Sequence, residues 1–347
     1  MFTALYLLAA RNQDWNVKVI IPLAGKGTRL RPHTHTTPKP LLHVGGRPVM
    51  SYIMDDLREL GVDEAVFVTG YLKEKIEDYI AADYGDFTAH FVEQPVQNGT
   101  AGAVQLAEPF VDSDVLIIFV DTLFDADLSL VKRLPEEYAG VIWAKEVEDF
   151  QRFGVIVRDA EGSMKRIVEK PTDPISKLAN IGLYYIRDWK LLFKGIHATM
   201  EGPKGKSGEY YLTDAFQYMV DHGAKIRVEE VSGWYDCGQL ETLIDTNRWL
   251  LENGRSRSPD GSRSVRIREP VRIEEDVKLE NCEIGPNVTV ESGSVLRHAK
   301  LRDCVIGRST TLENVDLHDS MIGDNAIVRG VNGVLSIGSD AQVDGTT

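Results

Sequence analysis

The 347-residue chain has 39 Lys and Arg residues against 53 Asp and Glu residues, a formal net charge of −14. This charge argues against nucleic acid or an anionic membrane as a partner, because both need a basic face on the protein. The length suits two domains, and three cysteines without CxxC or metal-ligand spacing predict reduced thiols in a cytoplasmic protein.

The first 16 residues are interpreted as an N-terminal extension. Their only apolar run, Ala4 to Ala10, is much shorter than the roughly 20 residues of a membrane span, and no basic segment precedes it. A weak secretory signal is the alternative interpretation.

Residues 17–253 are expected to form an α/β domain with a Rossmann-like mixed sheet flanked by helices, because short apolar runs alternate with amphipathic stretches. The run at 115–120 is the most apolar and predicts a central strand that ends at Asp121, where ligands of such sheets bind. Thr100 is expected to cap a helix. The predicted strands are 17–23, 65–69, 89–93 and 115–120, and the predicted helices are 49–60, 73–82 and 100–107.

A change of architecture is expected at residues 254–264, GRSRSPDGSRS, which are polar, lack apolar periodicity and predict a linker. In residues 265–347, apolar residues recur about every five or six positions, and Gly-containing turns follow them. This period predicts a left-handed parallel β-helix. The recurring residues are Ile284, Val290, Leu296, Leu301, Ile306, Leu312, Leu317, Ile322 and Val328.

A phosphate-binding loop is predicted at residues 23–31, LAGKGTRLR, where glycines and cations follow a strand. The loop is neither a GxxxxGK[ST] nor a GxGxxG motif. No acidic residue occurs between Asp14 and Asp55, so this stretch is a local electropositive site; an ordinary turn with solvated cations is the alternative. The cations in this window are Lys18, Lys26, Arg29, Arg31, Lys39 and Arg47.

The segment PLAGKGTRLRPHTHTTPKPLLHVGGRPVM resembles the signature of the sugar-1-phosphate nucleotidylyltransferases, G-x-G-T-R-L-x-P followed by P-K-P-L. The similarity continues over residues 17–252, and the chain most resembles the long form of glucose-1-phosphate thymidylyltransferase, which carries a β-helical tail. The resemblance implies the nucleotide-diphospho-sugar transferase fold, with Lys39 gripping the phosphates near the reacting centre. It assigns catalytic roles to Arg29, Lys39 and Lys170, and triphosphate binding to Leu23, Ala24, Gly25, Gly27 and Thr28.

Residues 93–103, EQPVQNGTAGA, resemble the base-binding segment of the same family, although Gln97 stands where the family often has proline. The resemblance adds Gln94, Gly99 and Thr100 to the nucleotide site. A simple Asn-Gly turn before a helix is the alternative interpretation.

Two aspartates match the metal-binding positions of the family: Asp121 and Asp236, the latter in GWYDCG. Mg²⁺ prefers one or two carboxylates together with substrate phosphates and water, so Mg²⁺ is the expected cofactor. Turn or cap residues are the alternative. His33 and His35 lack further ligands nearby and are interpreted as solvated polar residues.

The sugar side of the site is expected around Glu169-Lys170-Pro171, which resembles the EKP motif that holds the sugar and its phosphate. The plain alternatives are a surface ion pair, a turn and core aromatics. The sugar-phosphate-binding residues implied by the resemblance are Gly154, Glu169, Lys170, Asn180, Gly182, Glu209 and Trp234.

The expected reaction is nucleotidyl transfer from a nucleoside triphosphate, dTTP or UTP, to glucose 1-phosphate by a homo-oligomer, either a dimer or a tetramer. One alternative is mannose-1-phosphate guanylyl transfer, and another is a non-catalytic regulatory subunit that binds a sugar nucleotide. A third is acyl transfer by the β-helix with His298 or His318 as base, disfavoured because no long loop for an acyl donor is evident.

Overall fold

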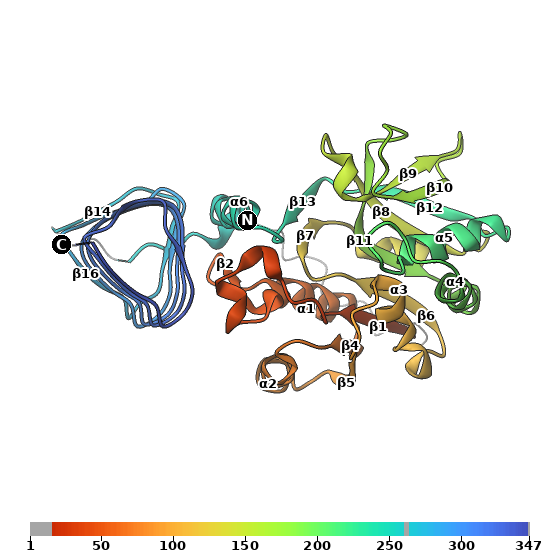
Figure 1. Ribbon diagram of the computed structural model, residues 1–347, viewed down its shortest axis with the longest axis horizontal. Coiled ribbons are helices and arrows are strands. Elements are labelled where there is room, and N and C mark those ends of the chain that lie inside the picture. The colour runs from red at the N-terminus through yellow and green to blue at the C-terminus, as the bar shows by residue number, and fades with distance from the viewer. Residues whose placement is uncertain (1–15, 260–263, 346–347) are drawn as a thin grey trace.

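The computed structural model describes residues 16–259 and 264–345, which form an α/β domain followed by a parallel β-helix (Figure 1). The predicted extension, residues 1–16, lies outside the described residues except for Asn16. Over the described ranges, no helix is both long and apolar enough to cross a membrane.

A nine-stranded mixed sheet forms the centre of the α/β domain, with the order β10-β9-β11-β6-β1-β4-β5; β8 pairs with β11 and β12. The pairs β1–β4 and β1–β6 are parallel, whereas β11 runs antiparallel to β6. The strands are β1 (Val17–Pro22), β4 (Glu64–Thr69), β5 (Thr88–Glu93), β6 (Asp114–Ile118), β8 (Gly140–Glu146), β9 (Gly154–Arg158), β10 (Met164–Glu169), β11 (Leu178–Ile186) and β12 (Ile226–Glu230).

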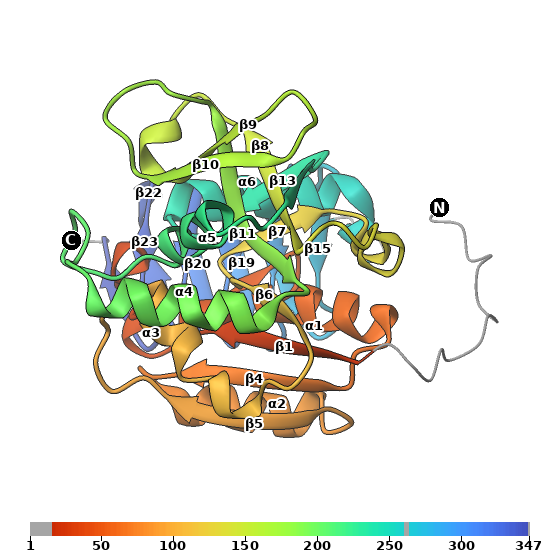
Figure 2. The same cartoon turned by 90° about the vertical axis from the view of Figure 1, so that its right-hand side faces the viewer.

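Helices cover both faces of the sheet, and α4 crosses the face that is nearer in Figure 2. In β1, Val19 and Ile21 join one buried apolar cluster while Ile20 joins the cluster on the opposite face. Burial on both faces explains why this strand is a continuous apolar run. The helices are α1 (Val49–Leu60), α2 (Lys73–Asp83), α3 (Thr100–Gln105), α4 (Trp189–Glu201), α5 (Leu212–Asp221) and α6 (Leu240–Leu250).

The predicted order of strands and helices is confirmed, with two corrections. The strand predicted for 115–120 ends at Ile118, because the chain then leaves the sheet to form β7 (Thr122–Asp125); Asp121 therefore lies in a turn. The helix predicted for 100–107 ends at Gln105 and is followed by a short 3₁₀ helix at Glu108–Phe110, which contains Pro109. Proline disfavours α-helical backbone at the preceding residue.

The parallel β-helix is confirmed, and successive coils advance 15 to 17 residues, since Ile327 pairs with Gln342, Val295 with Thr311 and Val271 with Val288. The nine recurring apolar residues all lie in its buried core. Corner residues such as Asn281 and Asn314 have positive φ, which Asn tolerates better than most residues. Its strands are β14 (Val265–Ile267), β15 (Val271–Ile273), β16 (Lys278–Glu280), β17 (Cys282–Ile284), β18 (Val288–Val290), β19 (Val295–Ile306), β20 (Thr311–Ile322), β21 (Ile327–Arg329), β22 (Asn332–Gly333), β23 (Ser336–Ile337) and β24 (Gln342–Asp344).

One residue of the predicted linker, Arg257, already pairs with a strand of the β-helix. Arg257 forms a parallel bridge with Arg272, its N–H donates to Val271 O at 2.7 Å, and its carbonyl accepts from Ile273 N at 3.0 Å. The division of the chain at residues 254–264 stays a proposal, with Arg257 lying on the β-helical side.

Candidate active site

A cavity of about 580 Å³ opens where the loops after β1 and β6 approach β13 (Gly233–Asp236). Every residue that the sequence predicts for the site lines this cavity, whereas Lys26 and Arg31 of the same glycine loop do not. The lining residues on the nucleotide side are Leu23, Ala24, Gly25, Gly27, Thr28, Arg29, Gln94, Gly99 and Thr100. The remaining ones are Lys39, Asp121, Gly154, Glu169, Lys170, Asn180, Gly182, Glu209, Trp234 and Asp236.

The glycine loop is held close to the segment that carries Lys39. Gly27 has φ 59°, and a Cβ on it would lie 3.0 Å from Cγ2 of Thr34 and 3.2 Å from Cβ of Lys39. The hydroxyl of Thr34 donates to Gly27 O at 2.9 Å. A side chain at Gly27 would therefore strain the backbone and press on Lys39.

Lys39 and the two aspartates come together from distant parts of the chain. Nζ of Lys39 lies 3.1 Å from Oδ2 of Asp121. Antiparallel pairing of β7 with β13 places Thr122 opposite Asp236, and Cys237 N donates to Asp121 O at 2.8 Å. The backbone of these two short strands thus fixes the aspartates side by side.

The two carboxylates fit the oxygen preference of Mg²⁺. Within residues 16–259 and 264–345 no group of three or more His, Cys, Asp or Glu side chains forms a ready metal site. Mg²⁺ is normally held by one or two carboxylates plus substrate phosphates and water, so a pair is sufficient. Oδ1 of Asp236 accepts from Gly238 N at 2.7 Å, and its Oδ2 lies 3.5 Å from Arg152.

On the nucleotide side, Gln94 is buried, and its Nε2 donates to Gly99 O at 3.2 Å. Gly99 has φ 115°, and a Cβ there would lie 2.3 Å from Tyr210 O, so only glycine fits. Gln97, which replaces the proline common in the family, donates from Nε2 to Ala24 O at 2.6 Å. This hydrogen bond joins the predicted base-binding segment, residues 93–103, to the glycine loop.

The expected capping role of Thr100 is wrong. Gly99 is the N-cap of α3, and no side chain caps this helix. The hydroxyl oxygen of Thr100 accepts instead from Leu212 N at 2.9 Å, because the chain after Glu209 packs against the start of α3. Thr100 therefore joins the nucleotide side of the cavity to the sugar side.

The opposite wall is built from β9, β10 and β11. Nδ2 of Asn180 donates to Gly154 O at 2.9 Å, and a Cβ on Gly154 would lie 2.4 Å from that amide nitrogen. Burial raises the pKa of Glu169, against the attraction of Lys170, whose Nζ lies 3.7 Å away. This wall thus presents a partly buried carboxyl and a cation together.

An unpaired donor also belongs to a lining residue of the cavity, Trp234. Nε1 of Trp234 is buried without a hydrogen-bond partner, and its ring meets Phe153 edge-on at 5.0 Å. Buried indole N–H groups are normally bonded, so this one is available to an acceptor on a ligand.

The lining residues that escaped prediction include Arg152, Tyr184 and Thr213. Arg152 directly precedes the Phe153-Gly154 pair, and Thr213 follows Glu209 in GEYYLTDA, so proximity to those motifs was an available signal. Tyr184 lies in an apolar strand and donates to Oδ1 of Asn180. Only the fold brings it to the cavity.

The interpretation of His33 as a solvated residue is wrong. His33 is 3% exposed, and its Nε2 lies 3.0 Å from the hydroxyl of Ser336 in the β-helix. Burial lowers its pKa to about 4. The residues next to His33 in the sequence do not indicate that a coil of the β-helix, 303 residues further on, covers it.

The family model of nucleotidyl transferases matches residues 18–253. The chain is 35% identical over 238 residues to bifunctional protein GlmU of Methanocaldococcus jannaschii, covering 67% of this chain but only 54% of that relative. It is 31% identical to UTP–glucose-1-phosphate uridylyltransferase AglF of Haloferax volcanii, covering 68% of this chain and 97% of the relative. Glucose-1-phosphate thymidylyltransferase of Streptomyces antibioticus is 28% identical and covers 90% of this chain and 85% of the relative.

A solved structure of UDP-glucose pyrophosphorylase in complex with UDP-glucose matches with a TM-score of 0.61 and 26% identity, over 68% of this chain and 98% of that chain. The resemblance seen in the sequence and the α/β fold that it implied are thus confirmed. Because the family model matches more than half of its residues, the chain belongs to the nucleotidyl transferase family.

Proposed function

We propose that this chain transfers the nucleotidyl group of a nucleoside triphosphate to a sugar 1-phosphate and releases pyrophosphate. The observation that supports this most is the meeting of Lys39, Asp121 and Asp236 in one cavity with the wall that carries Glu169 and Lys170. The first group suits phosphates and a divalent cation, and the second suits a phosphorylated sugar.

In the proposed reaction, a phosphate oxygen of the sugar 1-phosphate attacks the α-phosphorus. A new P–O bond forms, the bond from the α-phosphorus to the oxygen bridging to the β-phosphorus breaks, and its electron pair leaves with pyrophosphate. Because the nucleophile is already anionic at neutral pH, no general base is needed. The task of the protein is to position and screen two polyanions.

The cations of the cavity would perform that screening. Arg29 and Lys39 would contact the triphosphate, and Lys170 the phosphate of the sugar. Asp121 and Asp236 would hold Mg²⁺, which when bound supplies charge neutralisation at the transferred and leaving phosphates. The buried N–H of Trp234 would donate to a sugar oxygen.

We further propose dTTP or UTP with glucose 1-phosphate as substrates. Support comes from the names of two relatives, a UTP–glucose-1-phosphate uridylyltransferase and a glucose-1-phosphate thymidylyltransferase. One methyl group separates thymine from uracil and is worth only about 1–3 kcal/mol in a pocket, so both bases belong in the test.

The experiment is a substrate panel scored by pyrophosphate release. dTTP, UTP and GTP are each combined with glucose 1-phosphate and with mannose 1-phosphate, with Mg²⁺ and with EDTA. Release is expected only when triphosphate, sugar phosphate and Mg²⁺ are all present, and fastest with glucose 1-phosphate and a pyrimidine triphosphate. Absence of release with every pair would favour a non-catalytic protein, and fastest release with GTP and mannose 1-phosphate would favour guanylyl transfer.

Acyl transfer by the β-helix gains no support from the two candidate histidines. His318 is partly exposed and pairs with the neighbouring Asp319, Nδ1 to Oδ2 at 2.9 Å. Neither His298 nor His318 lines the active-site cavity or the second cavity beside β10.

A further inference from the structure

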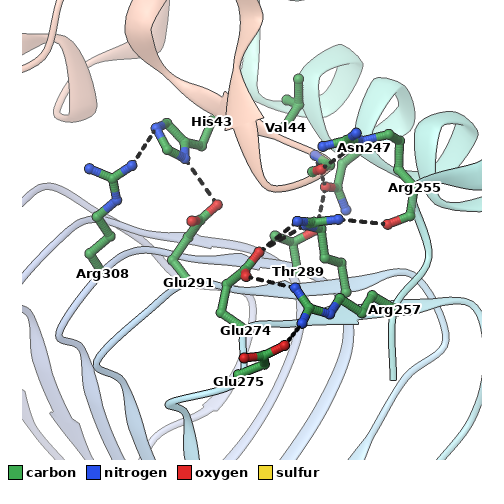
Figure 3. Close-up of polar contacts among 12 residues, drawn as sticks. His43, Val44, Asn247, Arg255, Arg257, Glu274, Glu275, Thr289, Glu291 and Arg308 are labelled. Carbon is green, nitrogen blue, oxygen red and sulfur yellow. Dashed lines mark hydrogen bonds and ion pairs between the residues drawn. The ribbon is translucent and has the colours of Figure 1, made fainter. Parts of the chain in front are cut away.

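Two segments of the active-site cavity continue to the same face of the β-helix. Lys39 is followed by β2 (His43–Val44) and Gly45, while Asp236 is followed by α6. Figure 3 shows both segments against the β-helical strands. Each segment therefore has a candidate catalytic or metal-binding residue, Lys39 or Asp236, at one end, and contacts the β-helix at its other end.

The carboxamide of Asn247 joins the two segments and the β-helix at one point (Figure 3). Asn247 is fully buried on α6; its Oδ1 accepts from Gly45 N at 2.9 Å and from the hydroxyl of Thr289 at 2.7 Å. Its Nδ2 donates to Asn287 O at 3.4 Å. Both lone pairs of one buried oxygen are thus used, one by each domain.

The preceding residue of α6 reaches back to the active site. The hydroxyl of Thr246 donates to Asp236 O at 3.1 Å, and Thr246 is also buried. Two neighbouring residues of one helix turn therefore bind the segment of Asp236 and the segment of Lys39. A shift of this turn would move both.

The turn after β2 leaves no space between the domains. Gly45 and Gly46 have φ 56° and 78°, and a Cβ on Gly46 would lie 1.9 Å from Nε of Arg272 in the β-helix. Arg272 is itself held by Glu274, Nε to Oε1 at 2.9 Å. The turn can approach Arg272 this closely only because it lacks side chains.

Further contacts hold the α/β domain against the β-helix. Nδ1 of His43 lies 3.0 Å from Oε1 of the buried Glu291, and Arg308 lies 3.4 Å from Nε2 of His43. Val305 and Met321 of the β-helix share a buried apolar cluster with residues of the α/β domain. The members from the α/β domain include Leu30, Leu42, Val44, Leu243 and Leu250.

We propose that Asn247, held by Thr289 of the β-helix, is a positioning residue for nucleotidyl transfer: it aligns the segment of Lys39 with the segment of Asp236. This inference rests on the proposed function. The β-helix thereby contributes to catalysis through the placement of these two groups, without touching a substrate.

The test compares Thr289→Val, which removes the hydroxyl and keeps the shape, with Thr289→Ser, which keeps the hydroxyl. Thr311→Val is the matched control, because Thr311 lies in a strand of the same β-helix, between Val295 and Ile327 of neighbouring coils. Thr289→Val is expected to lower kcat roughly three- to tenfold with KM for both substrates within about twofold, consistent with loss of one hydrogen bond. Thr289→Ser and Thr311→Val are expected to retain at least half of the wild-type kcat.

Asn247→Leu is expected to lower kcat roughly tenfold or more, and thermal unfolding shows whether this variant is folded at the assay temperature. If Asn247→Leu is unfolded, the comparison of Thr289→Val with Thr289→Ser still tests the proposal. A kcat of Thr289→Val equal to that of Thr289→Ser, even with a lower melting temperature, would mean that the contact is only structural and would overturn the proposal.

Amide hydrogen exchange over residues 38–46 gives a readout that needs no turnover. Thr289→Val is expected to exchange faster there than wild type, and Thr289→Ser at the wild-type rate. If the wild-type protein turned over no substrate pair, the proposed function would fail, and the exchange comparison would still decide whether Thr289 holds the segment of Lys39. Equal exchange in all three proteins would contradict the alignment itself.

Discussion

Lys39 and Asp121 meet in the active-site cavity, Nζ to Oδ2 at 3.1 Å, although 82 residues separate them in the sequence. Each has the charge needed by one component of the proposed reaction: the ammonium group can bind a phosphate, and the carboxylate can bind a divalent cation. Asp236 completes the arrangement from a third segment, because β13 pairs with β7. Triphosphate and metal ion would thus bind at adjoining points of one cavity.

Replacement of Lys39 by Ala should lower kcat on the order of 10²-fold or more, because a preorganised charge near the reacting phosphates is lost. Lys26→Ala is the matched control, since Lys26 belongs to the same cationic stretch but does not line the cavity. Steady-state pyrophosphate release measures both. Equal effects of the two substitutions would show that the stretch acts only through its overall charge.

Asp236→Asn should raise the Mg²⁺ concentration for half-maximal activity and lower turnover on the order of 10²-fold, since one of two candidate carboxylate ligands is neutralised. The control is Asp125→Asn, on the other end of the same strand pair, where Asp125 accepts from Ser232 at 2.6 Å outside the cavity lining. Titration of activity with Mg²⁺, together with direct Mn²⁺ binding measured by electron paramagnetic resonance, tests this. An unchanged metal requirement in Asp236→Asn would remove Asp236 from the metal site.

Trp234→Phe should raise KM for the sugar 1-phosphate roughly three- to tenfold and leave KM for the triphosphate unchanged, because the indole N–H is lost together with part of the ring that packs on Phe153. Trp249→Phe provides the control, as Trp249 stacks on Tyr235 at 3.8 Å and does not line the cavity. Initial rates with each substrate varied in turn separate the two constants. A rise confined to the triphosphate would place Trp234 on the nucleotide side.

His33 should make the fold sensitive to acid. Burial lowers its pKa from 6.5 to about 4, so the folded protein keeps His33 neutral where the unfolded chain binds a proton. Stability from this residue is therefore complete above pH 6.5 and is lost as the pH falls towards 4, by about 3 kcal/mol in all. His33→Gln should remove that loss.

Urea unfolding of wild type and His33→Gln between pH 4 and pH 7 provides the comparison. The difference in unfolding free energy should change across this range in favour of the variant at low pH. Parallel curves would show that His33 titrates alike in the folded and unfolded protein.

The sequence predicted well those features that depend on local pattern. The alternation of strands and helices, the six-residue period of the β-helix and the signature around Gly25 to Lys39 each need only neighbouring residues, and the expected site residues line one cavity. Thr100 was misjudged because its partner, Leu212, is 112 residues away. Tyr184 lines the cavity through strand pairing that no local pattern encodes.

Contacts between the domains were the least accessible to sequence-based reasoning. In the sequence, His33 has the features of an exposed loop histidine, but in the structure it contacts Ser336 of the β-helix. Asn247 likewise has the features of an ordinary polar residue of an amphipathic helix, but it is bonded to Thr289. Their burial depends on how the β-helix packs against α6 and the turn at Gly45. A pattern within one segment carries no information about that packing.

The direct attack of a sugar phosphate oxygen on the α-phosphorus is tested by oxygen-isotope transfer. The wild-type enzyme is incubated with Mg²⁺, the preferred triphosphate and sugar 1-phosphate labelled with ¹⁸O in all four phosphate oxygens, and both products are analysed by mass spectrometry. We predict that all four labelled oxygens appear in the nucleotide sugar and none in pyrophosphate. Label in pyrophosphate, or its absence from the nucleotide sugar, would contradict the proposed transfer.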